Sequence, residues 1–238
     1  MSGTTWSEII TGYAMVVIGD ERMTDDLATD AALFFRRMSI WLKMAMTMLN
    51  RPPELLTYLS EGLTNPVYAD AEWVSTQEST TRETVVETGK AGFELCSCVI
   101  AISARNGDVT FVPYTDFSYD PETGNVTFPQ QDNAGTEYRL DFYTDGAFAH
   151  ELTETQKRLL GLAVAVTWDN RFNREWLNIQ PKPHDKSFDV PNENTTMKES
   201  TARYKENAQL FFAELRKYEQ DCAYMRRVNP VRRIWKMI

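Results

Sequence analysis

The chain offers few groups of residues that could act together in catalysis. The segment DFYTDGAFAH brings Asp141, Asp145 and His150 close together in sequence. Two carboxylates and an imidazole are suited to metal binding or to acid–base chemistry. Nothing nearby completes a ligand set, so we favour a strand end, a turn at Asp145-Gly146 and an entry into the next helix.

A second candidate pair is His184 and Asp185, within QPKPHDKSFD. Pro181 and Pro183 precede the pair and Pro191 follows it, which indicates an extended loop. A catalytic dyad is one interpretation, but we favour a surface loop or a subunit-contact loop.

The three cysteines, Cys96, Cys98 and Cys222, are too few and too odd in number for a disulfide framework. We expect reduced thiols in a reducing compartment. The segment FELCSCVI places the first two on one face of a strand. A zinc site needs about four ligands, and the chain has only two histidines to help. We therefore expect buried or half-buried thiols and no metal.

The familiar catalytic signatures are also missing from the sequence. GxGxxG, GxxxxGK[ST], HExxH and GxSxG do not occur. We accordingly predict no catalytic residues, no cofactor and no enzymatic activity. A net charge of −9 argues against a protein that wraps nucleic acid tightly. The start MSGTTWSEII does not resemble a signal peptide, and no apolar run is long enough for a membrane span.

The C-terminal segment YMRRVNPVRRIWKMI is strongly asymmetric, because it holds basic and large apolar residues and no acid. A frayed end is the simplest interpretation, and membrane binding is another. We favour a docking peptide, since Trp and Ile beside Arg are typical of binding hot spots. The expected docking residues are Arg226, Arg227, Arg232, Arg233, Ile234, Trp235 and Ile238.

Before the first prolines, the sequence predicts a long helix that is apolar on two sides. Thr24 is its expected N-cap. One stripe contains Leu27, Ala31, Phe34, Met38, Trp41, Ala45 and Met48, and a second contains Phe35, Leu42, Met46 and Leu49. Pro52 and Pro53 end this helix, and PPELLTYLSEG begins a short new one.

The middle of the chain alternates like β-strands. The expected strands lie in FELCSCVIAISA, DVTFVPYTDF, NVTFP and EYRLDFYTDG. Asn106-Gly107 is a strong hairpin signal, and Pro121 with Gly124 predicts a second turn.

The last third returns to helix. Thr153 and Gln156 form an expected capping box, followed by a stripe of Gly161, Ala165, Trp168, Phe172 and Trp176. A final helix starting near Asn194 carries Met197, Thr201, Tyr204, Ala208, Phe211, Leu215, Tyr218 and Cys222 at heptad spacing.

These elements predict a mostly α protein with an inserted antiparallel β unit, an α+β fold. We expect a discontinuous helical bundle from residues 1–64 and 149–225, because neither helical part covers its apolar stripes alone. Residues 65–148 form the expected sandwich-like β insertion domain. Residues 226–238 form the C-terminal docking tail.

The order of segments resembles a known family. It runs from TTWSEIITGYAMVVIGD through LFFRRMSIWLKMAMTMLNRPPE, PETGNVTF and LDFYTDGAF to LTETQKRLLGLAVAVTWDNRFN and DVPNENTTMKESTARYKENAQLFFAELRKYEQDCAY. In this order the chain resembles the head-to-tail connector, or neck adaptor, proteins of tailed bacteriophages. The β insertion departs from the smallest, purely helical adaptors.

The resemblance implies a structural virion protein, assembled in the host cytoplasm and located in the neck. It implies a homo-oligomeric ring, expected to be dodecameric, between the portal protein and a tail or tail-completion protein. Viral DNA would pass through the ring without specific binding, and no membrane is involved. The alternatives are another tail or baseplate completion protein, or a β domain that binds small molecules or acts as an enzyme.

Overall fold

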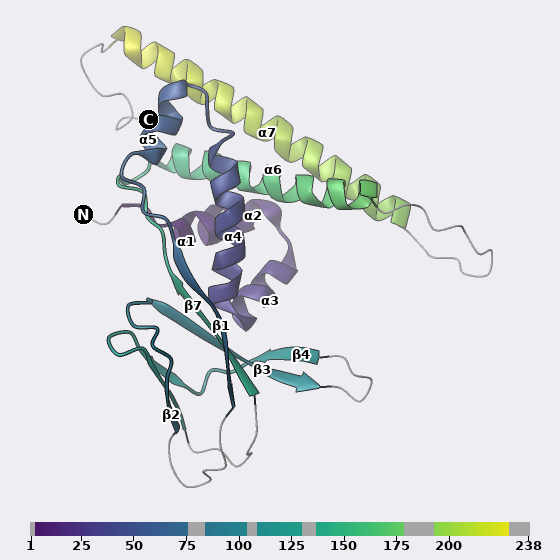
Figure 1. Cartoon of the computed structure of the whole chain (residues 1–238). Helices are drawn as coiled ribbons and strands as arrows, with labels where there is room; N and C mark the ends of the chain where they lie inside the picture. The colour runs from purple at the N-terminus through teal and green to yellow at the C-terminus, as the bar shows by residue number, and fades with distance from the viewer. Residues whose placement is uncertain (1–2, 76–83, 104–108, 130–136, 179–192, 229–238) are drawn as a thin grey trace, which may run out of the picture. The chain divides into compact units, whose positions relative to one another are not determined.

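The computed structural model describes residues 3–75, 84–103, 109–129, 137–178 and 193–228. Mixed α+β architecture is confirmed, with two small antiparallel sheets inserted between helical segments (Figure 1). The chain forms two compact units. Unit 1 contains Met1–Gly19, Ile40–Leu63 and Phe148–Ile238, and unit 2 contains Asp20–Ser39 and Thr64–Ala147.

The helical elements begin near the N-terminus and resume after the strands. They are α1 (Trp6–Ile9), the π-helical η1 (Ile10–Ala14), α2 (Met15–Ile18), α3 (Glu21–Thr29), α4 (Ala31–Met46), α5 (Pro53–Ser60), α6 (Glu154–Asn178) and α7 (Glu193–Val228). The strands are β1 (Val67–Ser75), β2 (Thr84–Glu87), β3 (Leu95–Ser103), β4 (Val109–Pro113), β5 (Ser118–Asp120), β6 (Asn125–Phe128) and β7 (Glu137–Thr144).

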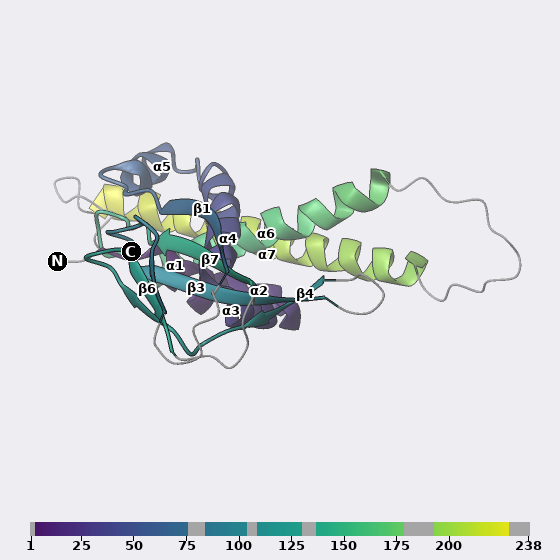
Figure 2. The same ribbon diagram turned by 60° about the horizontal axis from the view of Figure 1, so that its bottom comes forward.

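Unit 1 is built around α6, which lies beside α7 (Figure 1 and Figure 2). The pair is antiparallel, because Gln156 donates to the Tyr218 hydroxyl at 3.0 Å while Asn207 donates to Asp169 at 2.8 Å. The helical run α1–η1–α2 also packs against α6. Residues Leu159 to Val166 of α6 are buried, so this helix forms the centre of the unit.

The predicted capping box at the start of α6 is confirmed. Thr153 Oγ1 accepts from the Gln156 amide at 3.4 Å, and Gln156 Oε1 accepts from the Thr153 amide at 2.9 Å. These bonds satisfy two backbone donors that the helix cannot pair internally.

The predicted inner stripe of α7 is confirmed from Phe211 onward, whereas Thr201, Tyr204 and Ala208 are only half-buried. Phe211, Leu215, Tyr218 and Cys222 are buried, in agreement with the heptad spacing. The short helix α5 likewise begins at Pro53, as the double proline predicted.

Unit 2 contains a four-stranded sheet of order β1-β7-β3-β4 and a three-stranded sheet of order β2-β6-β5. All of the strand pairs are antiparallel. Their shared core joins Cys98, Tyr138, Leu140 and Phe142 of the larger sheet to Val126 and Phe128 of the smaller one. The two sheets therefore pack face to face, as the sandwich-like prediction required.

Strand β7 is buried on both faces. Tyr138, Leu140 and Phe142 point into the sandwich core, and Asp141 and Tyr143 on the alternate face are buried as well. This second face meets the first half of α4: Phe35 stacks on Tyr143 with ring centroids 5.6 Å apart. Unit 2 is thus a helix layer on a sheet on a second sheet.

The helix predicted to start at Thr24 begins elsewhere, and that prediction is wrong. Asp20 caps α3 by accepting from the Arg22 amide at 3.1 Å, so Thr24 lies inside this helix. The chain then breaks at Asp30, whose carboxylate accepts from the Leu33 amide at 3.0 Å and caps α4. Sequence spacing alone did not show this break, because the apolar stripe runs across it.

Residues 20–39 are grouped with the strands, whereas the sequence placed them with the helical bundle. Helix α4 accordingly belongs to unit 2 up to Ser39 and to unit 1 from Ile40 onward. Residues of its two apolar stripes pack against different elements. Phe35 packs on the sheet of unit 2. Trp41 contacts Trp168 of α6 in unit 1, with ring centroids 5.9 Å apart.

The turn predicted around Pro121 and Gly124 is confirmed as the link between β5 and β6. Gly124 has φ +76°, and a Cβ there would lie 2.6 Å from the Ala91 amide nitrogen. Only glycine avoids both problems. Asn106-Gly107 lies outside the described residues, although β3 and β4 pair with Ser103 opposite Val109.

The helix crossing at Gly161 allows a test of unit 1. A Cβ at Gly161 would lie 2.6 Å from Tyr13 Cβ, whereas one at Gly12 would meet nothing within 4 Å. Gly161→Ala should therefore lower the free energy of unfolding by about 1–3 kcal/mol. Gly12→Ala, the control, should leave it unchanged or raise it by up to about 1 kcal/mol. Urea unfolding followed by circular dichroism measures the free energy of unfolding of each variant. Equal changes in the two variants would contradict the close contact between Gly161 and Tyr13.

Candidate functional site

Two residues considered for catalysis, Asp145 and His150, have structural partners. Asp145 accepts from the Tyr143 hydroxyl at 3.0 Å and from the Gly146 amide at 2.8 Å, just beyond the end of β7. His150 stacks on Tyr58 with ring centroids 4.8 Å apart. His184 and Asp185 lie outside the described residues.

The thiols lie in the core, as expected. Cys98 and Cys222 are buried and Cys96 is half-buried. Burial raises the pKa of Cys98 to about 12 and that of Cys96 further, so both stay protonated near neutral pH. In the part of the chain that the structure describes, no group of three or more His, Cys, Asp or Glu residues is arranged to hold a metal ion.

Asp141 is the exception among these residues, because it is buried in the middle of β7 rather than at a strand end. Its Oδ2 lies 2.9 Å from Arg139 Nε, and Asp30 lies close enough to raise the pKa of its carboxyl. Ser97 of β3 donates to Asp30 and in turn accepts from the Ala32 amide at 3.1 Å. We call Asp30, Ser97, Arg139 and Asp141 the carboxyl cluster.

The carboxyl cluster holds two acids and one guanidinium in a buried setting. Burial and, after it, the neighbouring Asp30 raise the pKa of Asp141 to about 6, against the opposing effect of Arg139. A proton on Asp141 removes the excess negative charge that a single arginine cannot balance. The cluster therefore joins the start of α4 to the sheet in a manner that depends on protonation.

A hollow of about 420 Å³ opens beside the carboxyl cluster. It is lined by Asp26, Thr29, Asp30, Leu33, Phe34, Arg37, Val99, Thr110, Phe111 and Arg139. The sequence interpretation missed this site, because Asp30 and Asp141 are far apart in the chain. Alternation in EYRLDFYT, which places Arg139 and Asp141 on one strand face, was the available signal.

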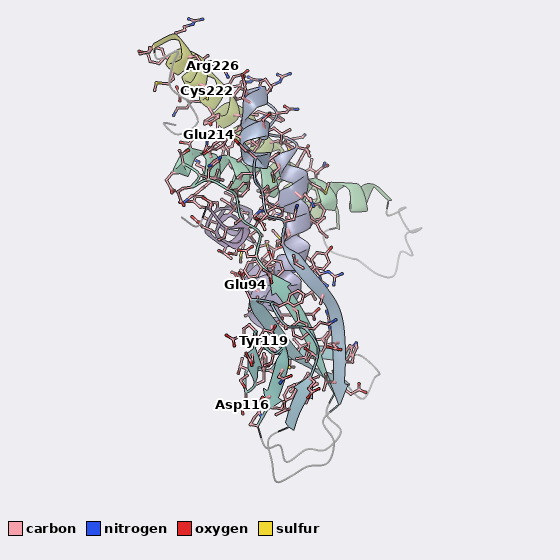
Figure 3. All side chains as sticks on the ribbon, turned by 60° about the vertical axis from the view of Figure 1, so that its left-hand side comes forward. Glu94, Asp116, Tyr119, Glu214, Cys222 and Arg226 are labelled. Carbon is pink, nitrogen blue, oxygen red and sulfur yellow. The ribbon has the colours of Figure 1, made fainter. Side chains whose placement is uncertain are left out.

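Two of the predicted docking residues lie on described backbone. Arg226 (labelled in Figure 3) and Arg227 are in the last turn of α7. Arg226 Nη2 lies 2.8 Å from Glu54 Oε1 of α5. Basic side chains at this end of a helix also complement its dipole. The other predicted docking residues lie outside the described part of the chain: Arg232, Arg233, Ile234, Trp235 and Ile238.

The outer side of α7 carries exposed apolar surface. Phe212 is 49% exposed although its neighbour Phe211 is buried. It lines two adjoining hollows, of about 390 and 580 Å³. We call the apolar lining of these hollows the α7 ledge, comprising Met48, Tyr204, Ala208, Phe212 and Leu215. Arg51, Lys205, Arg216 and Glu219 form its charged rim.

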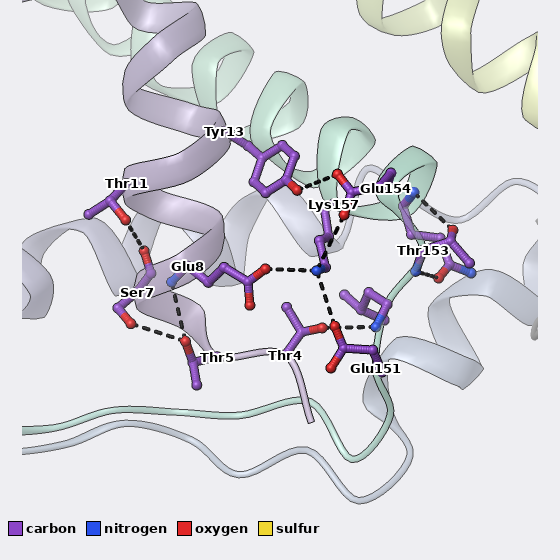
Figure 4. Close-up of polar contacts among 12 residues, drawn as sticks. Thr4, Thr5, Ser7, Glu8, Thr11, Tyr13, Glu151, Thr153, Glu154 and Lys157 are labelled. Atoms are coloured by element: carbon purple, nitrogen blue, oxygen red, sulfur yellow. Dashed lines mark hydrogen bonds and ion pairs between the residues drawn. The ribbon is translucent and has the colours of Figure 1, made fainter. Parts of the chain in front are cut away.

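A group of acids surrounds Lys157 at the start of α6 (Figure 4). Lys157 Nζ lies 2.7 Å from Glu8, 3.1 Å from Glu151 and 3.5 Å from Glu154. The lysine side chain is only 7% exposed, whereas the three glutamates are 42–78% exposed. Hydrogen bonding to Glu8 raises the pKa of Lys157. We call these four residues the acidic patch.

Comparisons with known proteins leave the chain without an assigned family. It matches no protein-family model, and neither the curated proteins nor the solved structures that were searched show significant similarity to it. Among the described residues, no helix is both long enough and apolar enough to cross a membrane.

The carboxyl cluster predicts a pH dependence of stability. The folded-state pKa of Asp141, about 6, lies above the ordinary value of about 3.9. The contribution of protonated Asp141 to the stability of the fold is therefore complete below about pH 4 and is lost as the pH rises through 6. Because Asn cannot titrate, the free energy of unfolding of Asp141→Asn should rise by about 2 kcal/mol relative to that of the wild type between pH 4 and pH 8.

Urea unfolding at a series of pH values measures this difference. Asp116→Asn is the matched control, because Asp116 is exposed in the loop between β4 and β5 (Figure 3). Its unfolding curve should follow the wild type at every pH. If the free energies of unfolding of Asp141→Asn and the wild type differed by the same amount at every pH, Asp141 would be charged throughout this range.

Proposed function

We propose that this protein is a head-to-tail connector of a tailed bacteriophage, a structural virion protein and not an enzyme. It would form a ring in the neck, between the portal and the tail. The sequence resemblance suggests this role, and the α7 ledge is the structural observation that supports it most. Phe212 lies between two hollows that Met48, Tyr204 and Leu215 also line, and an apolar area with a charged rim is typical of a protein-binding surface.

The charge balance of the chain supports the same proposal. A net charge of −9 disfavours tight binding of DNA phosphates. A channel whose wall repels phosphate lets DNA slide through without holding it. The ring would accordingly accompany DNA passage without reading its sequence.

A ligand-binding role for unit 2 is the second candidate. The hollow beside the carboxyl cluster combines the aromatic wall of Phe111 with Arg37 and Arg139, which is a mixture of apolar and polar groups found in small-molecule sites. A thermal-shift screen against small organic acids and amines tests it. Compounds that stabilise the wild type but not Arg139→Gln would favour this role.

Co-assembly with the cognate portal tests the connector proposal. We expect a ring of protomers, twelve if it matches the portal symmetry, seen by electron microscopy of portal mixed with this protein. Mass photometry gives the number of copies. A protein that stays monomeric with the portal and is missing from the particle neck would overturn the proposal.

The C-terminal residues give a specific prediction on this basis. Trp235→Ala should weaken portal binding by about 2 kcal/mol or more, because buried aromatic anchors supply much of the binding energy. A tail that binds DNA instead should tolerate this change and weaken steeply with salt. Portal pull-down over a range of salt concentrations separates the two.

Removal of residues 229–238 is the companion variant, since it leaves α7 and the Arg226–Glu54 pair in place. Asn229→Ala is the matched control and should bind like the wild type. Normal head–tail joining by both Trp235→Ala and the truncated chain would show that the tail is only a frayed end.

A further inference from the structure

We infer, on the basis of the proposed ring, that the α7 ledge of one protomer binds the acidic patch of a second copy of this chain. Both surfaces belong to unit 1. The contact would be head to tail, with two different patches meeting. Such heterologous contacts close into rings when the rotation between protomers allows it.

The ledge has the composition of a binding surface with a basic rim. Its centre is apolar, through Phe212 and Met48. Arg51, Lys205 and Arg216 of the rim outnumber its one acid, Glu219, so the rim carries a net positive charge. An apolar centre inside a polar rim is the usual arrangement of a protein interface.

The acidic patch supplies the opposite charge. Three glutamates face solvent above a single buried lysine, so the exposed side of the patch is negative. Tyr13, whose hydroxyl donates to Glu154 at 2.6 Å, extends this surface onto η1. Positive rim and negative patch would attract each other and fix the register of the contact.

The two surfaces lie on different sides of unit 1. Helix α6 packs against α7 on one side and against α1, η1 and α2 on the other (Figure 1). The ledge lies on α7 and the acidic patch lies where α1 meets the start of α6. One protomer therefore cannot bring its own ledge to its own patch, and a second copy is required.

A second copy fits this ledge better than DNA does. Glu219 on the rim and a predominantly apolar centre would both disfavour a phosphate backbone. The acidic patch offers carboxylates that can pair with Arg51 and Arg216. The same chain thus carries both halves of the contact.

Charge reversal in the purified protein, without portal, tests the inference. Arg216→Glu impairs only the ledge, and Glu151→Lys impairs only the patch. Each variant alone should associate at least about tenfold more weakly than the wild type. Lys217→Glu and Glu122→Lys are exposed, matched controls that lie outside both surfaces and should associate like the wild type. Analytical ultracentrifugation measures the assemblies.

Mixing the two variants is the decisive experiment. Arg216→Glu protein retains an intact patch, and Glu151→Lys protein retains an intact ledge. The mixture should therefore recover the larger assemblies that neither variant forms alone, because an intact ledge meets an intact patch and the two reversed charges again attract each other. A ledge-to-ledge contact would instead let Glu151→Lys protein dimerise alone.

A monomeric wild type, or a mixture that stays monomeric, would overturn the inference. Either result leaves the connector proposal open to its own test, because that test includes the portal. Conversely, self-association with these mutational effects but without portal binding would support the ledge-to-patch contact and reject the connector.

Discussion

The burial of β7 on both faces is the constraint on which unit 2 depends. One face of the strand must fill the sandwich core, which Tyr138, Leu140 and Phe142 do. The opposite face carries Asp141 and Tyr143, polar groups that cannot be buried without partners. Arg139 of the same strand lies 2.9 Å from Asp141. The segment before the strands supplies Ser39, 3.1 Å from the Tyr143 hydroxyl, and Asp30, which accepts from Ser97 of β3. Residues 20–39 are tied to the sheet for this reason.

Elements that carry their own signal were predictable from the sequence. Alternation identified β3, β4, β6 and β7, and the capping box and heptad stripe identified α6 and α7. Strands β1, β2 and β5 were missed. Strand β1 has an irregular register between Ala69 and Glu72, and β5 contains only three residues. Neither strand therefore presents a regular alternating run.

The parts that were not predicted depend on contacts between distant residues. Asp30 looks like any helical acid until Ser97 and Asp141 lie beside it. The α7 ledge was not predicted for a related reason. The heptad spacing assigned Tyr204 and Ala208 to the inner stripe of α7, and Phe212 follows directly after the buried Phe211. A single sequence gives the period of a helix but not the number of neighbours around it.

The division of the chain into two units has a consequence for biosynthesis. The whole of unit 2 lies between Asp20 and Ala147, whereas unit 1 lacks α6 and α7 until the last third of the chain has been made. A ribosome would therefore release a unit 2 that can fold while α1 and the end of α4 still wait for their helical partners. In that interval Trp6, Ile9 and Leu42, all fully buried in the finished molecule, are exposed to solvent and to chaperones.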